Sequence, residues 1–314
     1  MTNSQLENSK KKEYSFLFIL AVLWGGSFTL IKVALESYPP MTIVTSRLII
    51  GGLIILSIAI AINDKFPKNR RGWLELAAQG ILQGGLPFYL ITWAEKYIDS
   101  SVAGVLNSTP PMLVFIITVF LLHSARFDWS KFVGIIIGMS GVAIIALYRT
   151  DSSPEVENKL WAVFAVLAAS CSYAVGAIYG KRFAGQSVFV TGGTSLMLAG
   201  LITLPATLVL DRPFSLSPSL SPTVALLALT LLSTALASVI FFRLLKTLGS
   251  LATASNGYLR ALFSMVLGAL FLGEKIGEHM LVAAICIFCG VFLVTGQFRR
   301  LVLDRQAKGE AKNE

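Results

Sequence analysis

The chain has 314 residues, of which 55% are hydrophobic and only 14% are charged, whereas an ordinary soluble domain carries about 25% charged residues. A formal net charge of +9 would suit nucleic acid if the basic residues covered one soluble face, but they stand in short clusters between long apolar runs. This pattern argues against a soluble nucleic-acid-binding protein and predicts a chain embedded in a lipid bilayer.

The first apolar run, from about residue 14 to residue 35, follows three lysines as the hydrophobic part of a secretory signal would. No small-x-small cleavage site stands at its end, so we interpret it as an uncleaved helix. A helix needs about 20 apolar residues to cross the roughly 30 Å hydrocarbon core. Ten such stretches follow one another, at 15–35, 41–62, 73–94, 100–122, 131–148, 160–180, 188–210, 222–243, 250–272 and 279–297. None alternates with a period of two, so the predicted fold is an all-α polytopic membrane protein.

The loops between these ten spans divide the lysines and arginines unevenly. With the N-terminus inside, eighteen basic residues fall on the inner side, five fall on the outer side and three lie within spans. Basic residues concentrate on the cytoplasmic side of short loops. We therefore expect a multi-pass protein of the cell (inner) membrane with both termini in the cytoplasm.

A shift of 149 residues lines up the fourth span with the ninth and the fifth with the tenth, and it places Asn107 on Asn256. Each half has five spans, an odd number, so the two halves must be inverted relative to each other. Inverted repeats are the architecture of alternating-access carriers, which hold their substrate near the midplane. The predicted organisation is a cytoplasmic N-terminal tail (1–14), a first repeat (15–148), an extracytoplasmic linker (149–159), a second repeat (160–297) and a cytoplasmic C-terminal tail (298–314).

Four motifs follow one another in a specific order and spacing. They are Leu23-Trp24-Gly25-Gly26-Ser27-Phe28, then Arg47, then the segment 100–122 with Pro110-Pro111, then Leu272-Gly273-Glu274 followed by Gly290. Together they resemble the EamA family of the drug/metabolite transporter (DMT) superfamily over about residues 15–297. Two departures are His123-Ser124-Ala125 in place of Leu-Gly-Glu, and Arg260 where the first half has Pro111. The resemblance implies a ten-helix transporter and leaves the substrate open, since members carry amino acids, metabolites and drugs.

Three cationic side chains lie within the predicted spans: Lys32, Arg47 and Arg260. A charge in the hydrocarbon core costs roughly 2.5–3.5 kcal/mol on insertion scales and marks a functional site by default. Lys32 and Arg47 stand near the outer ends of their spans, where topological anchoring at the interface is the alternative. Arg260 stands about ten residues into its span and shares a helix face with Asn256. Its alternative role is structural, binding backbone carbonyls that the prolines of the fourth span leave free.

Acidic residues are absent from the interior of all ten predicted spans, and Glu36, Glu75, Glu95 and Glu274 lie at span ends. The buried cations therefore lack an obvious protein counter-ion, which favours a substrate with a carboxylate or phosphate. The same absence argues against exchange of protons for drugs through an intramembrane carboxylate. Any proton coupling must use another route.

Polar and aromatic side chains at helical spacing complete the predicted pocket. Trp24 shares a face with Lys32, Gln79 shares one with Gln83, and Tyr89 belongs to an aromatic pair. Packing or an interface belt is the alternative for each aromatic residue, whereas an amide facing lipid would be costly. The predicted substrate-binding residues are Trp24, Lys32, Arg47, Gln79, Gln83, Tyr89, Asn107, Asn256, Tyr258 and Arg260.

The favoured function is export or exchange of a small metabolite, an amino acid or another anionic compound, by alternating access. Efflux of neutral or cationic drugs is the alternative within transport. A membrane-embedded enzyme would need a clustered nucleophile, acid–base pair or metal site, and neither His123 nor His279 has partners at metal-ligand spacing. We predict no catalytic residue, metal, cofactor or nucleic-acid partner, while the sequence leaves monomer and dimer both open.

Overall fold

In the computed structural model the described residues are 3–124, 127–147, 155–247 and 256–294, and every regular element among them is a helix. The first half contains α1 (Asn3–Ala34), α2 (Pro40–Ala61), α3 (Arg70–Gly80), η1 (Ile81–Gly85), α4 (Leu86–Ala94), α5 (Ser100–Leu106), α6 (Pro110–Ile116), η2 (Ile117–Leu121) and α7 (Trp129–Leu147). The second half contains α8 (Glu155–Tyr179), η3 (Gly180–Phe183), α9 (Val188–Ala206), η4 (Thr207–Asp211), η5 (Pro213–Ser215), α10 (Leu220–Ala228), η6 (Leu229–Leu236), α11 (Ala237–Thr247), α13 (Asn256–Leu272) and α14 (Glu278–Val294).

Apart from the start of the first helix, which begins at Asn3 rather than near residue 15, the described helices reproduce the ten predicted spans to within a few residues at the ends that the structure describes. Seven helical stretches are long and apolar enough to cross a membrane, and two shorter apolar helices cover Leu259–Leu272 and Glu278–Val294. The continuous helical segment 70–94 supplies the one span not yet counted, the third in chain order. The prediction of an all-α ten-helix fold is confirmed. Residues 149–154 of the predicted linker, residues 250–255 of the ninth span and the tail at 298–314 lie outside the described residues.

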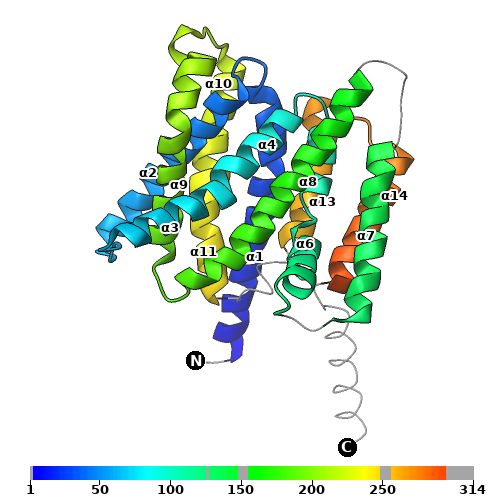
Figure 1. The fold of residues 1–314 in the computed structure, drawn as a ribbon, viewed down its shortest axis with the longest axis horizontal. Helices are drawn as coiled ribbons and strands as arrows, with labels where there is room; N and C mark the ends of the chain where they lie inside the picture. Colours follow the sequence, from blue (N-terminus) through cyan, green and yellow to red (C-terminus); the bar gives the residue numbers. More distant parts are fainter. Residues whose placement is uncertain (1–2, 125–126, 148–154, 248–255, 295–314) are drawn as a thin grey trace, which may run out of the picture.

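Helix packing follows the inverted repeat (Figure 1). Helix α1 packs on α13, and its counterpart α8 packs on α5 and α6. Helix α4 packs on α8, and correspondingly α10 and α11 pack on α1. The self-related pairs are α2 with α9 and α7 with α14. The main contacts between halves therefore recur when each helix is exchanged for its counterpart, as a two-fold axis in the membrane plane requires.

The third and eighth spans carry a π-helical segment at matching positions. A shift of 149 residues places η1 (81–85) on 230–234, inside η6. In η1 the cause is local, because Pro87 has no N–H to offer the carbonyl of Gln83. In η6 the Thr234 hydroxyl donates to the Leu229 carbonyl at 3.1 Å. Such widened turns occur frequently at functional sites.

Glycines permit the closest approach between the two halves. A Cβ atom at Gly290 of α14 would lie 2.5 Å from the Gly134 carbonyl oxygen and 2.7 Å from the Gly138 Cα of α7. A Cβ atom at Gly25 of α1 would lie 2.5 Å from the Phe263 Cβ of α13. Glycines thus form the faces at which these helices pack closely.

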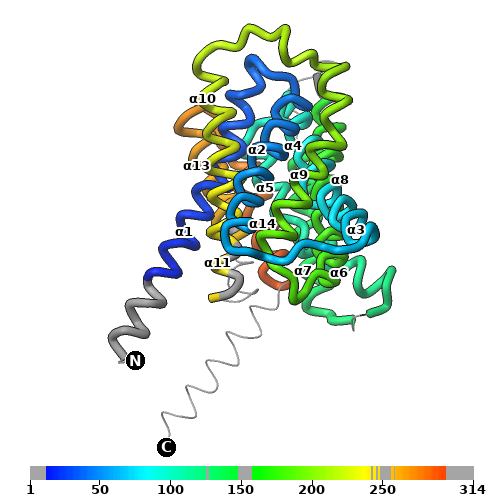
Figure 2. Tube along the Cα trace, turned by 90° about the vertical axis from the view of Figure 1, so that its left-hand side faces the viewer, coloured from blue at the N-terminus to red at the C-terminus, as the bar shows by residue number. Residues whose placement is uncertain are grey.

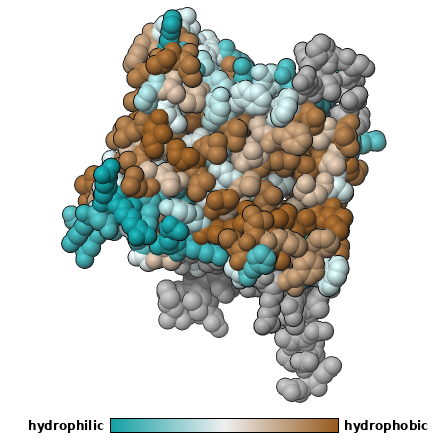
Figure 3. Space-filling model, viewed as in Figure 1, coloured by the Kyte–Doolittle hydropathy of each residue, from teal (hydrophilic) through white to brown (hydrophobic). Residues whose placement is uncertain are grey.

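The outer surface of the bundle is apolar around its middle. Large hydrophobic side chains point outward from several helices, such as Ile136 (56% exposed), Phe164 (52%), Ile202 (54%) and Ile285 (61%). Figure 3 shows hydrophobic atoms across the middle of one face, with hydrophilic atoms gathered at its lower left. In water such a surface would drive aggregation, whereas in a bilayer it contacts lipid.

The two ends of the bundle are called the lower end and the upper end. The lower end holds the start of α1 and the loop 62–69, and the upper end holds the loops 35–39 and 212–219 (Figures 1 and 2). Helix α1 begins at Asn3, so most of the predicted N-terminal tail is helical and extends from the lower end.

Candidate functional site

A hollow of about 190 Å³ lies between the two halves. Helix α1 and the break between α5 and α6 line it from the first half, and α11, α13 and α14 line it from the second. The lining residues are Trp24, Asn107, Ser108, Pro110, Pro111, Phe241, Asn256, Gly257, Arg260 and Val291. Four of the predicted substrate-binding residues, namely Trp24, Asn107, Asn256 and Arg260, therefore meet in one place.

The break between α5 and α6 explains how Arg260 is positioned. Helix α5 ends at Leu106 and α6 begins at Pro110, so the carbonyl of Asn107 faces Pro111, which has no N–H to bind it. The Arg260 Nη2 atom donates to this carbonyl at 2.7 Å across the boundary between the halves. The structural contact considered from the sequence is thus present. It uses one of the five donors of the guanidinium group, and the buried Nε atom has no hydrogen-bond partner among the described residues.

Asn107 and Asn256, which the repeat relates to each other, add acceptors to the hollow. Both side chains are buried, at 2% exposure each. The Asn256 Nδ2 atom donates to the Leu17 carbonyl at 3.1 Å, which fixes the orientation of this amide. Within the described part of the chain, the Oδ1 atoms of both asparagines lack a hydrogen-bond partner. The lining of the hollow therefore includes an arginine and two asparagines whose buried side-chain oxygens have no hydrogen-bond partner among the described residues.

Arg47 lies in α2, and it does not line the hollow. Its side chain is buried rather than extended to the interface. The Nε atom donates to the Thr234 Oγ1 atom of η6 at 3.2 Å, and the guanidinium carbon lies 4.2 Å from the Phe88 ring centroid. Arg47 therefore connects the first half to the π-helical segment of the second half.

Tyr173 of α8 was not singled out by the sequence analysis, yet it lies within electrostatic range of both Arg47 and Arg260. Its backbone carbonyl accepts a hydrogen bond from the Gln83 Nε2 atom at 3.0 Å. The repeat contains the signal that would have found it, because Tyr173 stands 149 residues after Trp24. An aromatic residue thus occupies equivalent positions in α1 and α8.

The remaining predicted residues lie elsewhere in the bundle. Gln79 has a buried Oε1 atom without a partner among the described residues. Tyr89 packs against a small apolar cluster of α2 and α9. The Lys32 Nζ atom donates to the backbone carbonyls of Glu95 (2.6 Å) and Ile98 (2.8 Å) at the upper end. The side chain of Tyr258 lies outside the described residues.

Polar contacts join the two halves at the upper end. The Thr42 N and Oγ1 atoms donate to the Asp211 Oδ2 atom at 2.7 and 2.9 Å. The Glu274 carboxylate accepts from the backbone N–H groups of Ser100 (2.7 Å) and Ser101 (3.0 Å) at the start of α5. Each contact pairs a residue of one repeat with a residue of the other.

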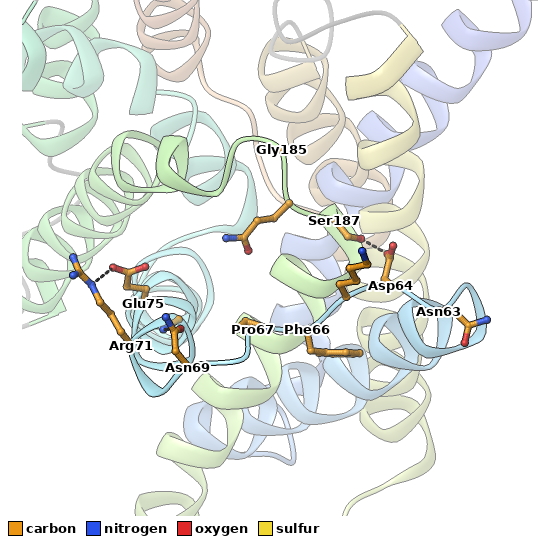
Figure 4. Close-up of a pocket in the computed structure, with 12 residues that line it drawn as sticks. Asn63, Asp64, Phe66, Pro67, Asn69, Arg71, Glu75, Gly185 and Ser187 are labelled. Atoms are coloured by element: carbon orange, nitrogen blue, oxygen red, sulfur yellow. Dashed lines mark hydrogen bonds and ion pairs between the residues drawn. The ribbon is translucent and has the colours of Figure 1, made fainter.

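Contacts between the halves also occur at the lower end. The Arg243 Nη2 atom lies 2.7 Å from the Glu13 Oε1 atom, and the Ser187 hydroxyl donates to the Asp64 carboxylate. A separate surface hollow of about 790 Å³ lies beside this second contact, between the loop 62–69 and residues 185–187 (Figure 4). Its Glu75 carboxylate is paired with Arg71 at 3.1 Å. This hollow lies at the lower end, and it shares no lining residue with the hollow beside Arg260.

Comparison with known proteins gives a consistent family. The model of the EamA-like transporter family matches twice, over residues 11–147 and 160–296, and the two matches are again 149 residues apart. The "Uncharacterized inner membrane transporter YedA" of Escherichia coli (strain K12) is 24% identical over 288 residues, covering 91% of each chain. The "Uncharacterized transporter YvbV" of Bacillus subtilis (strain 168) is 26% identical over 294 residues, covering 91% of this chain and 92% of the relative. A solved crystal structure with 18% identity has a TM-score of 0.63 and covers 93% of this chain and 99% of its own.

Proposed function

This chain belongs to the EamA-like transporter family, and we propose that it exports or exchanges a small amino acid or similar carboxylate by alternating access. The observation that carries the proposal is the hollow between the halves, whose lining includes Arg260 and two asparagines with side-chain oxygens that lack a partner among the described residues. Both halves line this hollow, so a rocking motion of one half against the other would expose it to each side in turn.

Charge supports a substrate with a carboxylate group. Arg47 is a buried cation and Arg260 a half-buried one, and among the described residues neither forms an ion pair. The fork of an arginine side chain matches a carboxylate with two parallel hydrogen bonds. The free oxygens of Asn107 and Asn256 are acceptors that would bind a protonated amine. An amino acid carries both groups.

Size and charge together favour a small metabolite over the alternative of cationic drug efflux. The hollow measures about 190 Å³, below the roughly 300–1,000 Å³ of sites that hold drug-sized ligands. An organic cation would be expected to meet a carboxylate, and the described lining contains no Asp or Glu. We place the lower end in the cytoplasm, because the predicted topology assigns eighteen of the basic residues to the side of the loop 62–69 and five to the opposite side.

Counterflow in proteoliposomes tests the proposal, with a labelled panel of amino acids, organic anions and organic cations. Charge-assisted hydrogen bonds contribute about 1.5–3 kcal/mol, and tenfold in affinity corresponds to about 1.4 kcal/mol. We expect exchange of at least one zwitterion or anion, weakened about 10- to 100-fold by Arg260→Gln. The matched control is Lys96→Gln, which removes an exposed cation at the upper end and should leave exchange unchanged.

Two outcomes of the counterflow assay would contradict the proposed function. Exchange of organic cations without any anion or zwitterion would overturn the proposal. So would unchanged apparent affinity in Arg260→Gln. Unfolding midpoints measured on the same preparations separate loss of binding from loss of folding.

A further inference from the structure

Glu95 is a buried acid that does not contact the substrate in the proposed function. It is the residue directly after α4, at the upper end, and its side chain has 0% exposure. Among the described residues, neither of its carboxylate oxygens has a hydrogen-bond partner. Placing a charged carboxylate in such an environment carries a large desolvation penalty. By its position in the sequence, Glu95 was expected only to mark the end of a span.

The charged groups around Glu95 come from four elements. The Lys32 Nζ atom of α1 donates to the backbone carbonyls of Glu95 and Ile98 rather than to the carboxylate. Burial is the main cause that raises the pKa of Glu95, and Glu274 raises it further, while Lys32 and Arg47 oppose the change. Asp99, which precedes α5, is influenced by the same Glu274 and Lys32. The neutral acid is therefore the form of Glu95 that suits this arrangement.

Glu274 connects this acid to closure of the upper end. It follows α13 in the second half, and its carboxylate binds the backbone of Ser100 and Ser101 in the first half. Closure between the halves therefore brings a second carboxylate toward Glu95. A charged Glu95 would repel Glu274 and attract the Lys32 ammonium group away from the two carbonyls that it binds.

We propose that Glu95 is a proton-binding site that links protonation to closure of the upper end. When this end closes, the Glu95 carboxylate takes one proton from water and becomes a neutral acid; when it opens, the acid returns the proton to water. The inference rests on the alternating access of the proposed function. It extends that function by making the open and closed states depend on pH at the upper side.

Accessibility of a single thiol tests this link without knowledge of the substrate. Ser101→Cys places a reporter at a residue that is 1% exposed beside the Glu274 contact, in a background where Cys171, Cys286 and Cys289 are replaced by serine. A membrane-impermeant maleimide is added to the upper side of oriented vesicles, and the labelling rate is measured from about pH 5 to pH 9. The rate at Lys96→Cys, exposed at the same end, corrects for thiol ionisation.

We expect the corrected rate to fall as the pH falls, with a slope of up to about tenfold per pH unit, the limit for one proton. Glu95→Gln mimics the neutral acid, so its rate should be low and independent of pH. Glu36→Gln is the matched control, since it removes an exposed carboxylate from the same end and should retain the wild-type profile. If Glu95→Gln fails to fold, Glu95→Asp serves instead and should displace the profile along the pH axis.

The link between protonation of Glu95 and closure would be overturned if the corrected labelling rate of the wild type were the same at every pH. It would also be overturned if the pH dependence survived in Glu95→Gln, or if Glu95→Asp left the pH profile in place. Counterflow on the same proteins distinguishes this failure from that of the proposed function. Intact counterflow with a pH-independent reporter rejects the proton site alone. A pH-dependent reporter without counterflow of any zwitterion or anion rejects the substrate assignment alone.

Discussion

Replacing Gly290 by alanine perturbs a tight backbone contact between the two halves. The added Cβ would lie 2.5 Å from the Gly134 carbonyl oxygen and 2.7 Å from the Cα and N atoms of Gly138. These are all backbone atoms, so no side chain can rotate away. Ordinary van der Waals contact begins near 3.4 Å. Helices α7 and α14 must therefore separate by about an ångström to accept the added methyl group, as backbones shift when a core is overpacked.

The magnitude follows from two opposing effects. Overpacking costs about 1–3 kcal/mol, and clashes with three backbone atoms place this site toward the upper value. Alanine is favoured over glycine in a helix interior by about 1 kcal/mol. We therefore expect Gly290→Ala to lower the free energy of unfolding by about 2 kcal/mol.

Gly257→Ala is the matched control, because no atom of the described residues lies within 4 Å of its added Cβ. This variant should be as stable as the wild type or slightly more stable, so the two substitutions should differ by about 2–3 kcal/mol. Denaturant titration of purified protein in mixed micelles measures both. Equal unfolding midpoints for Gly290→Ala and Gly257→Ala would refute the packing of the two halves described here.

Three further substitutions test individual contacts. Glu274→Gln replaces charge-assisted hydrogen bonds by neutral ones, a loss of about 1 kcal/mol or more. The thiol reporter at position 101 should therefore be labelled about five- to tenfold faster. An unchanged labelling rate would contradict the role of Glu274 in closing the upper end. Thr234→Val removes the acceptor of the Arg47 Nε atom and should lower the free energy of unfolding by about 1–3 kcal/mol. In an Arg47→Leu background the same change should have little effect on this free energy. Equal losses of stability in both backgrounds would show that the contact contributes nothing. Asn256→Ala should weaken exchange of amino acids about tenfold while sparing carboxylates without an amine, and equal weakening of both would argue against an amine contact.

The ten spans were predictable because a membrane imposes a length and an apolar composition on every crossing helix. The meeting of Arg260 with Asn107 was partly predictable as well. Prolines at 110 and 111 free carbonyls in the fourth span, and a deep arginine is the donor that such carbonyls attract. The repeat offset then related Asn107 to Asn256, and both line the same hollow.

Other parts of the site depend on tertiary packing that a single sequence does not encode locally. Glu95 stands at a span end, a position that usually faces water, but Lys32 binds the backbone around it and the side chain becomes buried. Tyr173 looked like one aromatic among many, because only the packing of α8 places it near two arginines. Lys32 and Tyr89 matched a helical stripe, yet neighbouring helices place both outside the lining of the hollow.

The most direct test of the central claim is to lock the upper end and ask from which side the hollow can be reached. The Ser37 and Ser219 hydroxyl oxygens, one from each half, are 3.5 Å apart, so cysteines at both positions should form a disulfide. A third cysteine at Ser108 reports on the hollow. With the disulfide formed, we predict labelling of this cysteine from the lower side only, and recovery of upper-side labelling after reduction. Labelling from the upper side while the disulfide is intact would contradict alternating access through this hollow.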